Sequence, residues 1–311
     1  MLDVIIALIP ALAVSVYFFG PRVLTMTLVS VVSCVAFEFL YRLVMKKPRS
    51  IGDLSACVTG VLLAMCLPVN APYWLPVVGA FFAIVIVKQL FGGLGKNFMN
   101  PALAGRVFLF SFPSLMNTWA AAGTENWTGL LGTADAVTSA TPMASLHQGV
   151  LPDLTLSQML LGDHGGSMGE VPVLMLILGG LYLLLRKVIS WRIPVCYIGT
   201  VAVLTFLFPL GGNGRLEWMA ANLLCGGLML GAIFMATDYV SSPVTVKGQF
   251  FYAVGCGALT VFLRYFGTYP EGVSFSILVM NAFVPLLDKA GMPHRFGTPH
   301  FWQKKKGGKQ P

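Results

Sequence analysis

The chain has 311 residues, of which 56% are hydrophobic and only 10% are charged, and its mean hydropathy is +0.79. Soluble domains carry about 25% charged residues, so this composition excludes a soluble enzyme, a disordered chain and a disulfide-stabilised scaffold. It predicts an all-α integral membrane protein. The net charge of +8 is explained by Lys and Arg in loops at one membrane face, so we expect lipid, and no nucleic acid, as a partner.

Apolar segments predict about ten transmembrane helices, because a span needs about 20 apolar residues and broken helices can use fewer. In chain order the segments are 2–19, 22–45, 52–67, 73–90, 102–118, 171–188, 194–210, 217–236, 249–266 and 272–288. Five segments precede the long polar loop 119–170 and five follow it. An odd number per half reverses the orientation, so we expect two inverted five-helix repeats, with a ligand site near the middle of the membrane.

Basic residues fix the expected orientation, because Lys and Arg gather in cytoplasmic loops. On one side the predicted loops and the tail hold Lys46, Lys47, Arg49, Lys88, Lys96, Arg186, Lys187, Arg192, Lys247, Lys289, Arg295, Lys304, Lys305, Lys306 and Lys309. The opposite loops hold only Arg22 and Arg215. Both termini are therefore predicted to be cytoplasmic, and the loop 119–170 to lie outside.

The expected organisation has four parts. Residues 1–118 form the first membrane repeat, 119–170 an extracytoplasmic loop, 171–288 the second repeat, and 289–311 a basic cytoplasmic tail. A polar loop as long as 119–170 predicts a functional segment rather than a simple connection. His147 and His164 are isolated in this loop, have no metal-ligand spacing, and are expected to be solvated.

The first polar motif, GGLGKNFMNPALAGR at 92–106, lies where the fifth span begins. Pro101 suits the first turn of a helix, and Asn100 suits the residue that caps it. Asn97, Asn100 and Arg106 are polar groups at the edge of an apolar region, which favours a ligand site. An ordinary turn between helices explains the same residues equally well.

The second motif, ATDYVSSPVTVKG at 236–248, lies at the end of the eighth span. Asp238, Ser242 and Thr245 could line a ligand or cation pocket, or they could cap helix ends. Glu38, Asp53, Arg264 and Glu271 are further ionisable residues in or near spans, and such residues are functional candidates because membrane burial of charge is costly. No metal site or catalytic triad is predicted.

The third motif, DAVTSATPMA at 135–144, lies inside the long loop. By residue type alone it is a turn of small residues that ends at Pro142. The hydroxyl of Thr141 has short neighbours, so a bulky group could approach it.

Together the three motifs resemble the flavin-bearing membrane subunit shared by two related complexes. In the Rnf ion-translocating electron transport complex this subunit is RnfD, and in the Na⁺-translocating NADH:quinone reductase it is NqrB. The resemblance is carried by FGGLGKNFMNPALAGRVFLFSFP at 91–113, DAVTSATPMA at 135–144, and MATDYVSSPVTVKGQ and YPEGVSFSILVMNAFVPLLD within 235–288. The stretch ATDYVSSP is more similar to the Rnf subunit.

The resemblance implies covalent FMN, joined through a phosphodiester to the Thr141 hydroxyl by a flavin transferase. The recognition motif of the transferase would comprise Asp135, Thr138, Ala140 and Thr141, and Ser139 and Pro142 are counted with them as cofactor-binding residues. A second flavin, non-covalent riboflavin, is implied near Asn97, Asn100 and the segment 238–245, with Arg106, Asp238, Ser242 and Thr245 counted among the cofactor-binding residues.

The resemblance also implies a function in a bacterial cytoplasmic membrane. The chain would carry electrons between ferredoxin and NAD⁺ as one subunit of an electron transport complex that moves Na⁺ or H⁺, and it would not be active alone. Its partners would be the other Rnf-type subunits. Two alternatives remain open: the quinone-reductase subunit, and a non-redox channel or transporter with inverted repeats.

Overall fold

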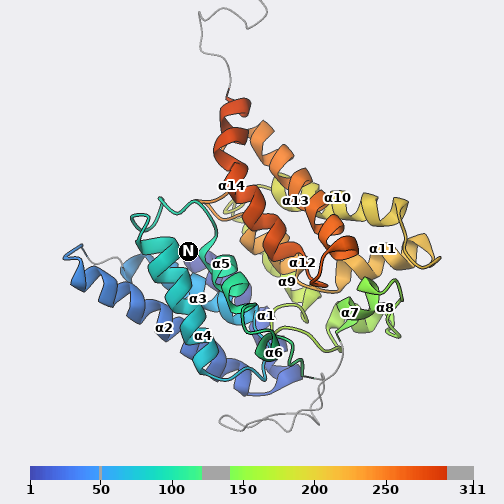
Figure 1. Ribbon diagram of the computed structural model, residues 1–311, viewed down its shortest axis with the longest axis horizontal. Coiled ribbons are helices and arrows are strands. Elements are labelled where there is room, and N and C mark those ends of the chain that lie inside the picture. Colours follow the sequence, from blue (N-terminus) through green and yellow to red (C-terminus); the bar gives the residue numbers. More distant parts are fainter. Residues whose placement is uncertain (49–50, 121–140, 293–311) are drawn as a thin grey trace, which may run out of the picture.

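The computed structural model describes residues 1–48, 51–120 and 141–292, and every regular element within these ranges is a helix (Figure 1). The first part of the chain forms α1 (Leu2–Phe19), α2 (Arg22–Val44), η1 (Ile51–Asp53), α3 (Ser55–Met65), α4 (Trp74–Phe81), the π-helix η2 (Phe82–Gln89), α5 (Pro101–Leu109) and α6 (Pro113–Met116). Two short helices follow, α7 (Pro142–His147) and α8 (Leu156–Leu161).

The second part of the chain also consists of helices, one of them a π-helix. It forms α9 (Val173–Leu185), α10 (Arg192–Leu207), α11 (Arg215–Leu224), α12 (Leu228–Leu230), the π-helix η4 (Gly231–Met235), α13 (Val246–Phe266) and α14 (Val273–Gly291). In Figure 1 the early helices α2 to α6 lie on one side of the molecule, and α10, α11, α13 and α14 lie on the other.

Four helices in the described ranges are long and apolar enough to cross a membrane: α1, α2, α13 and α14. The pair formed by α11 and the joined α12–η4 makes a fifth candidate, bent by 63°. Shorter apolar helices cover 55–65, 74–89, 173–185 and 192–207. The chain is thus a multi-pass helical membrane protein, while the number of ten crossings stays a prediction.

Breaks within the predicted spans explain why fewer than ten of the described helices are long enough to cross a membrane. The expected span 102–118 is two short helices, because Pro113 begins α6 after Phe112 leaves the helical conformation. The expected span 217–236 breaks at Gly226, whose φ of +81° is a conformation that favours glycine. Residues 225–227 at the second break are buried, and the amide of Gly227 donates to the Glu271 carboxylate, so this break brings a polar contact inside the protein.

Small residues bring the helices together. α1 packs along α9, and a side chain at Gly179 would overlap the backbone carbonyl of Ala7. α10 packs along α13, where a Cβ at Gly257 would lie 2.6 Å from Cβ of Thr200. Close backbone approach at small residues is a usual way for helices to associate in membranes. The order of contacts, α2 with α3 and α4, and α10 with α11 and α13, suits two related halves, but the inverted repeat remains a prediction.

The segment that leads into α9 is buried rather than exposed. The amide of Gly169 donates to the carbonyl of Met65 at 2.7 Å, and the amide of Met168 donates to that of Leu67 at 3.2 Å. These bonds satisfy carbonyls at the end of α3. His164 is only 6% exposed, so the prediction that its side chain is solvated was wrong. His147 is also packed against the protein, with Nδ1 2.7 Å from the carbonyl of Arg264.

Candidate functional site: two polar cavities

The first cavity, here called the Asn100 cavity, measures about 700 Å³ including its open mouth. It lies between α3, η2, the start of α5 and the segment that follows η4. Its polar lining consists of Ser55, Thr59, Lys88, Asn97, Asn100, Thr237 and Asp238. The first two sequence motifs therefore meet at one place, although about 140 residues separate them.

Asn100 is held by its role as a helix cap. Its Oδ1 accepts hydrogen bonds from the amides of Ala102 at 3.0 Å and Leu103 at 3.3 Å, and Pro101 occupies the first turn of α5, as the sequence predicted. Its Nδ2 donates to the carbonyl of Met235 at 3.1 Å. Asn97 is 5% exposed and donates to the carbonyl of Met99. Both amides are thus fixed at the cavity wall.

The segment 236–245 supplies the other wall. Asp238 accepts a hydrogen bond from the Ser241 hydroxyl at 2.8 Å, and desolvation raises the pKa of this carboxyl despite that bond. Ser242 and Thr245 are not among the described residues that line the cavity. Thr245 instead caps α13 by accepting from the Gly248 amide, and its own hydroxyl donates to Asp288. Thr245 therefore acts as a helix cap, which is one of the two roles expected for it.

A buried ion pair borders this cavity. The Nζ atom of Lys88 lies 2.7 Å from Oε2 of Glu38 and 2.6 Å from the Ser55 hydroxyl, and both charged side chains are at most 2% exposed. Lys88 sits in the π-helix η2, and it lines the cavity while Glu38 lies behind it. The sequence singled out Glu38 but used Lys88 only to assign a loop, so this pairing was missed.

The second cavity, here called the Thr141 cavity, measures about 440 Å³ including its mouth. Its lining consists of Arg106, Phe110, Asn117, Trp119, Thr141, Met143, Glu170, Tyr269, Pro270 and Glu271. These residues come from α5 and its C-terminal end, the residues that follow α6, the start of α7, the segment before α9 and the turn before α14. Of the third motif, Thr141 and Pro142 are described, whereas Asp135, Thr138, Ser139 and Ala140 lie outside the described residues.

Thr141 precedes α7 in an extended conformation, with φ −73° and ψ 147°. Pro142 occupies the first turn of the helix, so it fixes where α7 begins. The Thr141 hydroxyl does not accept a bond from the amides of α7, although a threonine at this position commonly does. The hydroxyl is therefore uncommitted to capping, and it borders the cavity.

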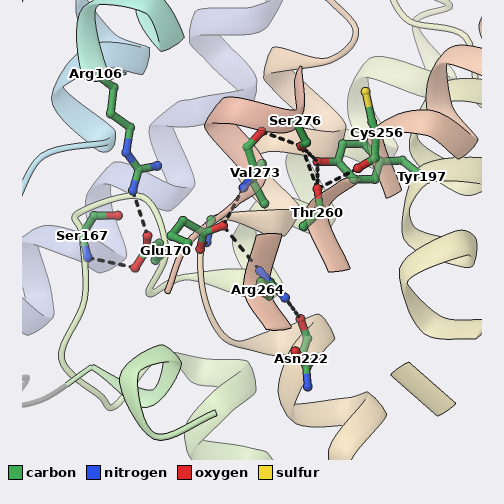
Figure 2. A network of polar contacts seen from close by, with 12 residues as sticks. Arg106, Ser167, Glu170, Tyr197, Asn222, Cys256, Thr260, Arg264, Val273 and Ser276 are labelled. Atoms are coloured by element: carbon green, nitrogen blue, oxygen red, sulfur yellow. Dashed lines mark hydrogen bonds and ion pairs between the residues drawn. The ribbon is translucent and has the colours of Figure 1, made fainter. Parts of the chain in front are cut away.

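Two buried arginine–glutamate pairs flank this cavity (Figure 2). Nη2 of Arg106 lies 3.4 Å from Oε1 of Glu170, and Nη2 of Arg264 lies 3.6 Å from Oε1 of Glu271. The Glu271 carboxylate also accepts from the amide of Gly227 at 2.8 Å, at the break between α11 and α12. Charges that are buried in this way are tolerated because they are paired.

Arg106 belongs to the Thr141 cavity and not to the Asn100 cavity, where the sequence had grouped it. α5 connects the two cavities, because Asn100 caps its beginning and Arg106 and Phe110 lie toward its end. Six residues of helix advance about 9 Å, which takes Arg106 away from Asn100. Glu170, paired with Arg106, was missed as a site residue; an acid directly before the apolar segment 171–188 was the available signal.

Figure 2 also shows a cluster of hydroxyl-bearing side chains, Tyr197, Thr260 and Ser276. The Tyr197 hydroxyl lies 2.7 Å from that of Thr260 and 3.0 Å from that of Ser276, so α10, α13 and α14 are joined. All three side chains are fully buried. This cluster fastens three membrane helices together. In the described part of the chain, no group of three His, Cys, Asp or Glu side chains is arranged to hold a metal ion.

These features define a class: a multi-pass membrane protein that keeps two cavities with polar linings among its helices. Comparison with known proteins narrows the class. The family described as NQR2, RnfD, RnfE matches residues 1–297, and the chain belongs to this family.

Its relatives carry specific names. The chain is 47% identical over 302 residues to the subunit designated D in the Na⁺-translocating ferredoxin:NAD⁺ oxidoreductase complex of Acetobacterium woodii, covering 96% of this chain and 90% of that one. It is 42% identical to the subunit of the same designation in the proton-translocating ferredoxin:NAD⁺ oxidoreductase complex of Clostridium ljungdahlii, covering 96% and 91%. It is 39% identical to the corresponding subunit of the ion-translocating oxidoreductase complex of Stutzerimonas stutzeri, with the same coverage.

Proposed function

We propose that the chain is the RnfD subunit of a membrane-bound, ion-translocating ferredoxin:NAD⁺ oxidoreductase complex, and that it carries electrons through FMN attached to Thr141. The proposal rests on family membership over almost the whole chain and on the names of relatives at 42–47% identity. The chain would work only with the other subunits. The observation that carries the cofactor assignment is the uncommitted Thr141 hydroxyl beside a polar cavity.

The Thr141 cavity fits a flavin phosphate ester by its chemistry. In the transferase reaction the Thr141 oxygen would form the bond to the FMN phosphorus, FAD would release AMP, and the hydroxyl proton would pass to a base of the transferase. The cavity offers flat aromatic side chains, Phe110 and Tyr269, and a buried guanidinium, Arg106, to a flat ring with polar edges. FMN would supply one- and two-electron transfer, while the protein supplies binding and electrostatics.

We place the second flavin, riboflavin, in the Asn100 cavity. Asn97 and Asn100 offer fixed amides, and Thr59 and Asp238 offer oxygen atoms that suit the hydroxyls of a ribityl chain. Apolar residues such as Val58 and Phe234 complete the lining.

We further propose that the protein lies in the bacterial cytoplasmic membrane, with both termini in the cytoplasm. The uneven distribution of basic residues supports this orientation. Thr141 would then face the outer side and the Asn100 cavity the inner side. One relative is named for Na⁺ and another for protons, so the ion remains one of these two.

In-gel flavin fluorescence tests the assignment. The chain would be co-expressed with a flavin transferase as wild type, Thr141→Ala and Thr141→Ser. We expect fluorescent bands for wild type and for T141S, which keeps a hydroxyl, and a dark band for T141A. Thr155→Ala is the matched control, because Thr155 also precedes a short helix in the same loop, and it should stay fluorescent.

A dark wild-type band, with the transferase active on another substrate protein, would refute covalent FMN. Bound flavin together with quinone reduction in place of ferredoxin-linked activity would favour the quinone-reductase alternative. Solute flux in liposomes without flavin would favour a transporter.

A further inference from the structure

Arg106 is a buried cation with unused hydrogen-bonding capacity. Its side chain is 4% exposed, and its Nε has no hydrogen-bond partner among the described residues. The contact of Nη2 with Glu170 is long, at 3.4 Å. A guanidinium has five N–H donors, and leaving a buried donor unpaired costs free energy, so a site with such a group commonly receives an acceptor.

The acidic groups at the cavity are already satisfied by the backbone. Oε2 of Glu170 accepts from the amide of Ser167 at 3.2 Å. The two oxygens of Glu271 accept from the amides of Gly227 at 2.8 Å and Val273 at 3.1 Å. Both carboxylates therefore have backbone donors in addition to the arginines.

The second arginine has one firm hydrogen bond away from the cavity, while its Nε and Nη2 have no hydrogen-bond partner among the described residues. Nη1 of Arg264 donates to the carbonyl of Asn222, which lies in α11 on the far side of the helix break (Figure 2). Arg264 is also absent from the described lining of the cavity, whereas Arg106 lines it together with Thr141. Arg106 is thus the arginine that lines the cavity with Thr141, and its positive charge and unpartnered Nε are available to a ligand joined there.

The aromatic side chains beside Arg106 strengthen the action of its charge on a bound ligand. Arg106 lies 5.7 Å from the ring centre of Phe110, and Phe110 stacks on Tyr269 with centres 5.1 Å apart and planes 25° apart. An apolar, water-poor wall lowers the local dielectric, so a fixed positive charge acts more strongly on a neighbouring charge than it would in water.

We propose that Arg106 sets the reduction potential of the flavin at Thr141 by favouring negative charge on its ring, and that Glu170 moderates this effect. The inference rests on the proposed function. Two electrons from the reduced donor of the complex and one proton from water convert the neutral oxidised ring to a ring with one negative charge. The guanidinium stabilises the charged product more than the neutral reactant, so it raises the midpoint potential.

Two substitutions test the inference, because one removes the positive charge of Arg106 and the other removes the negative charge of Glu170. The flavin-loaded complex would be prepared in membranes as wild type, Arg106→Gln and Glu170→Gln, and the midpoint potential of the covalent flavin followed by its visible absorption. We expect R106Q to move the potential to more negative values and E170Q to move it to more positive values. Arg186→Gln is the control, because it removes the same charge at a side chain that is 61% exposed and far along the chain.

The outcomes separate this inference from the proposed function. A fluorescent wild-type band whose potential is unchanged in R106Q would refute the role of Arg106 and leave covalent FMN standing. No covalent flavin on the wild type would refute both. If R106Q takes up no flavin, E170Q decides, because an unchanged or more negative potential in E170Q would refute the inference. A structural role alone predicts shifts of the same sign in both variants.

Discussion

The side-chain amide of Asn100 donates a hydrogen bond of 3.1 Å to the backbone carbonyl of Met235. Met235 is the last residue of the π-helix η4, so this bond joins the start of α5 to the second half of the chain. The other end of the same amide caps α5. One side chain therefore fixes both the helix that links the two cavities and the contact between the halves.

Asn100→Ala should destabilise the protein through both bonds. Loss of an N-cap costs about 0.5–2 kcal/mol, and the Met235 carbonyl would lose its partner as well. Asn100→Ser keeps a capping oxygen and loses the donor to Met235, so it should be less destabilising. Thermal unfolding of the detergent-solubilised protein would compare the two variants. Equal melting temperatures for N100A and wild type would contradict the dual role.

Gly226→Ala should damage the Thr141 cavity. A Cβ there would overlap Oε2 of Glu271 and lie 3.0 Å from Nη2 of Arg264, in addition to the strain of φ +81°. Gly212→Ala is the matched control, because φ is +73° and no atom lies within 4 Å of the added Cβ. The control carries only the conformational cost, about 1–2 kcal/mol. We expect G226A to lose more stability than G212A in chemical unfolding, and a smaller loss would show that the contact is unimportant.

Val58→Trp should empty the Asn100 cavity of flavin and leave Thr141 loaded. Val58 lines that cavity from α3, and a larger ring there would occupy the space for a ligand. Acid extraction releases non-covalent flavin, so its content per protein would be compared with the fluorescence of the protein band. Leu178→Trp is the control, since Leu178 is 48% exposed on the apolar helix α9. Undiminished extractable flavin in V58W would place riboflavin elsewhere.

Two cysteine substitutions test the orientation. Val150 and Val244 are 57% and 82% exposed and lie in loops that we assign to opposite sides of the membrane. A membrane-impermeant maleimide should label Val150→Cys in intact cells and Val244→Cys only in inverted vesicles. The parent chain controls for its six free cysteines, of which Cys57 and Cys196 are partly exposed. Labelling of both variants in intact cells would refute the topology.

Composition and apolar length were enough to predict the long helices. The predicted segments 2–19 and 22–45 agree with α1 and α2 to within one residue, because each is bounded by a glycine, a proline or basic residues. The segment 217–236 was predicted as one span because apolar residues continue across Gly226 and Gly227. Only the packed structure, in which Glu271 bonds to the Gly227 amide, shows why the helix breaks there.

The residues of the two cavities were predicted only in part, because the sequence shows local polar residues but not which distant residues they meet. Asn97, Asn100 and Asp238 could be recognised as polar residues at the ends of apolar segments, and they do meet. Arg106 was placed with them because it is close in the sequence, yet the helix carries it to the other cavity. Its partner Glu170 is 64 residues away, and no local pattern encodes a pairing over that distance.

The hydrogen bonds from Met168 and Gly169 to the end of α3 have a consequence for the integrity of the chain. They tie the entrance of the second half to the first half, as do the packing of α1 on α9 and the bond between Asn100 and Met235. A peptide break between residues 120 and 135 would leave all of these links, and the motif at 135–144, in place. The two fragments, co-produced as separate polypeptides, should therefore find each other in the membrane and co-purify as a functional split protein.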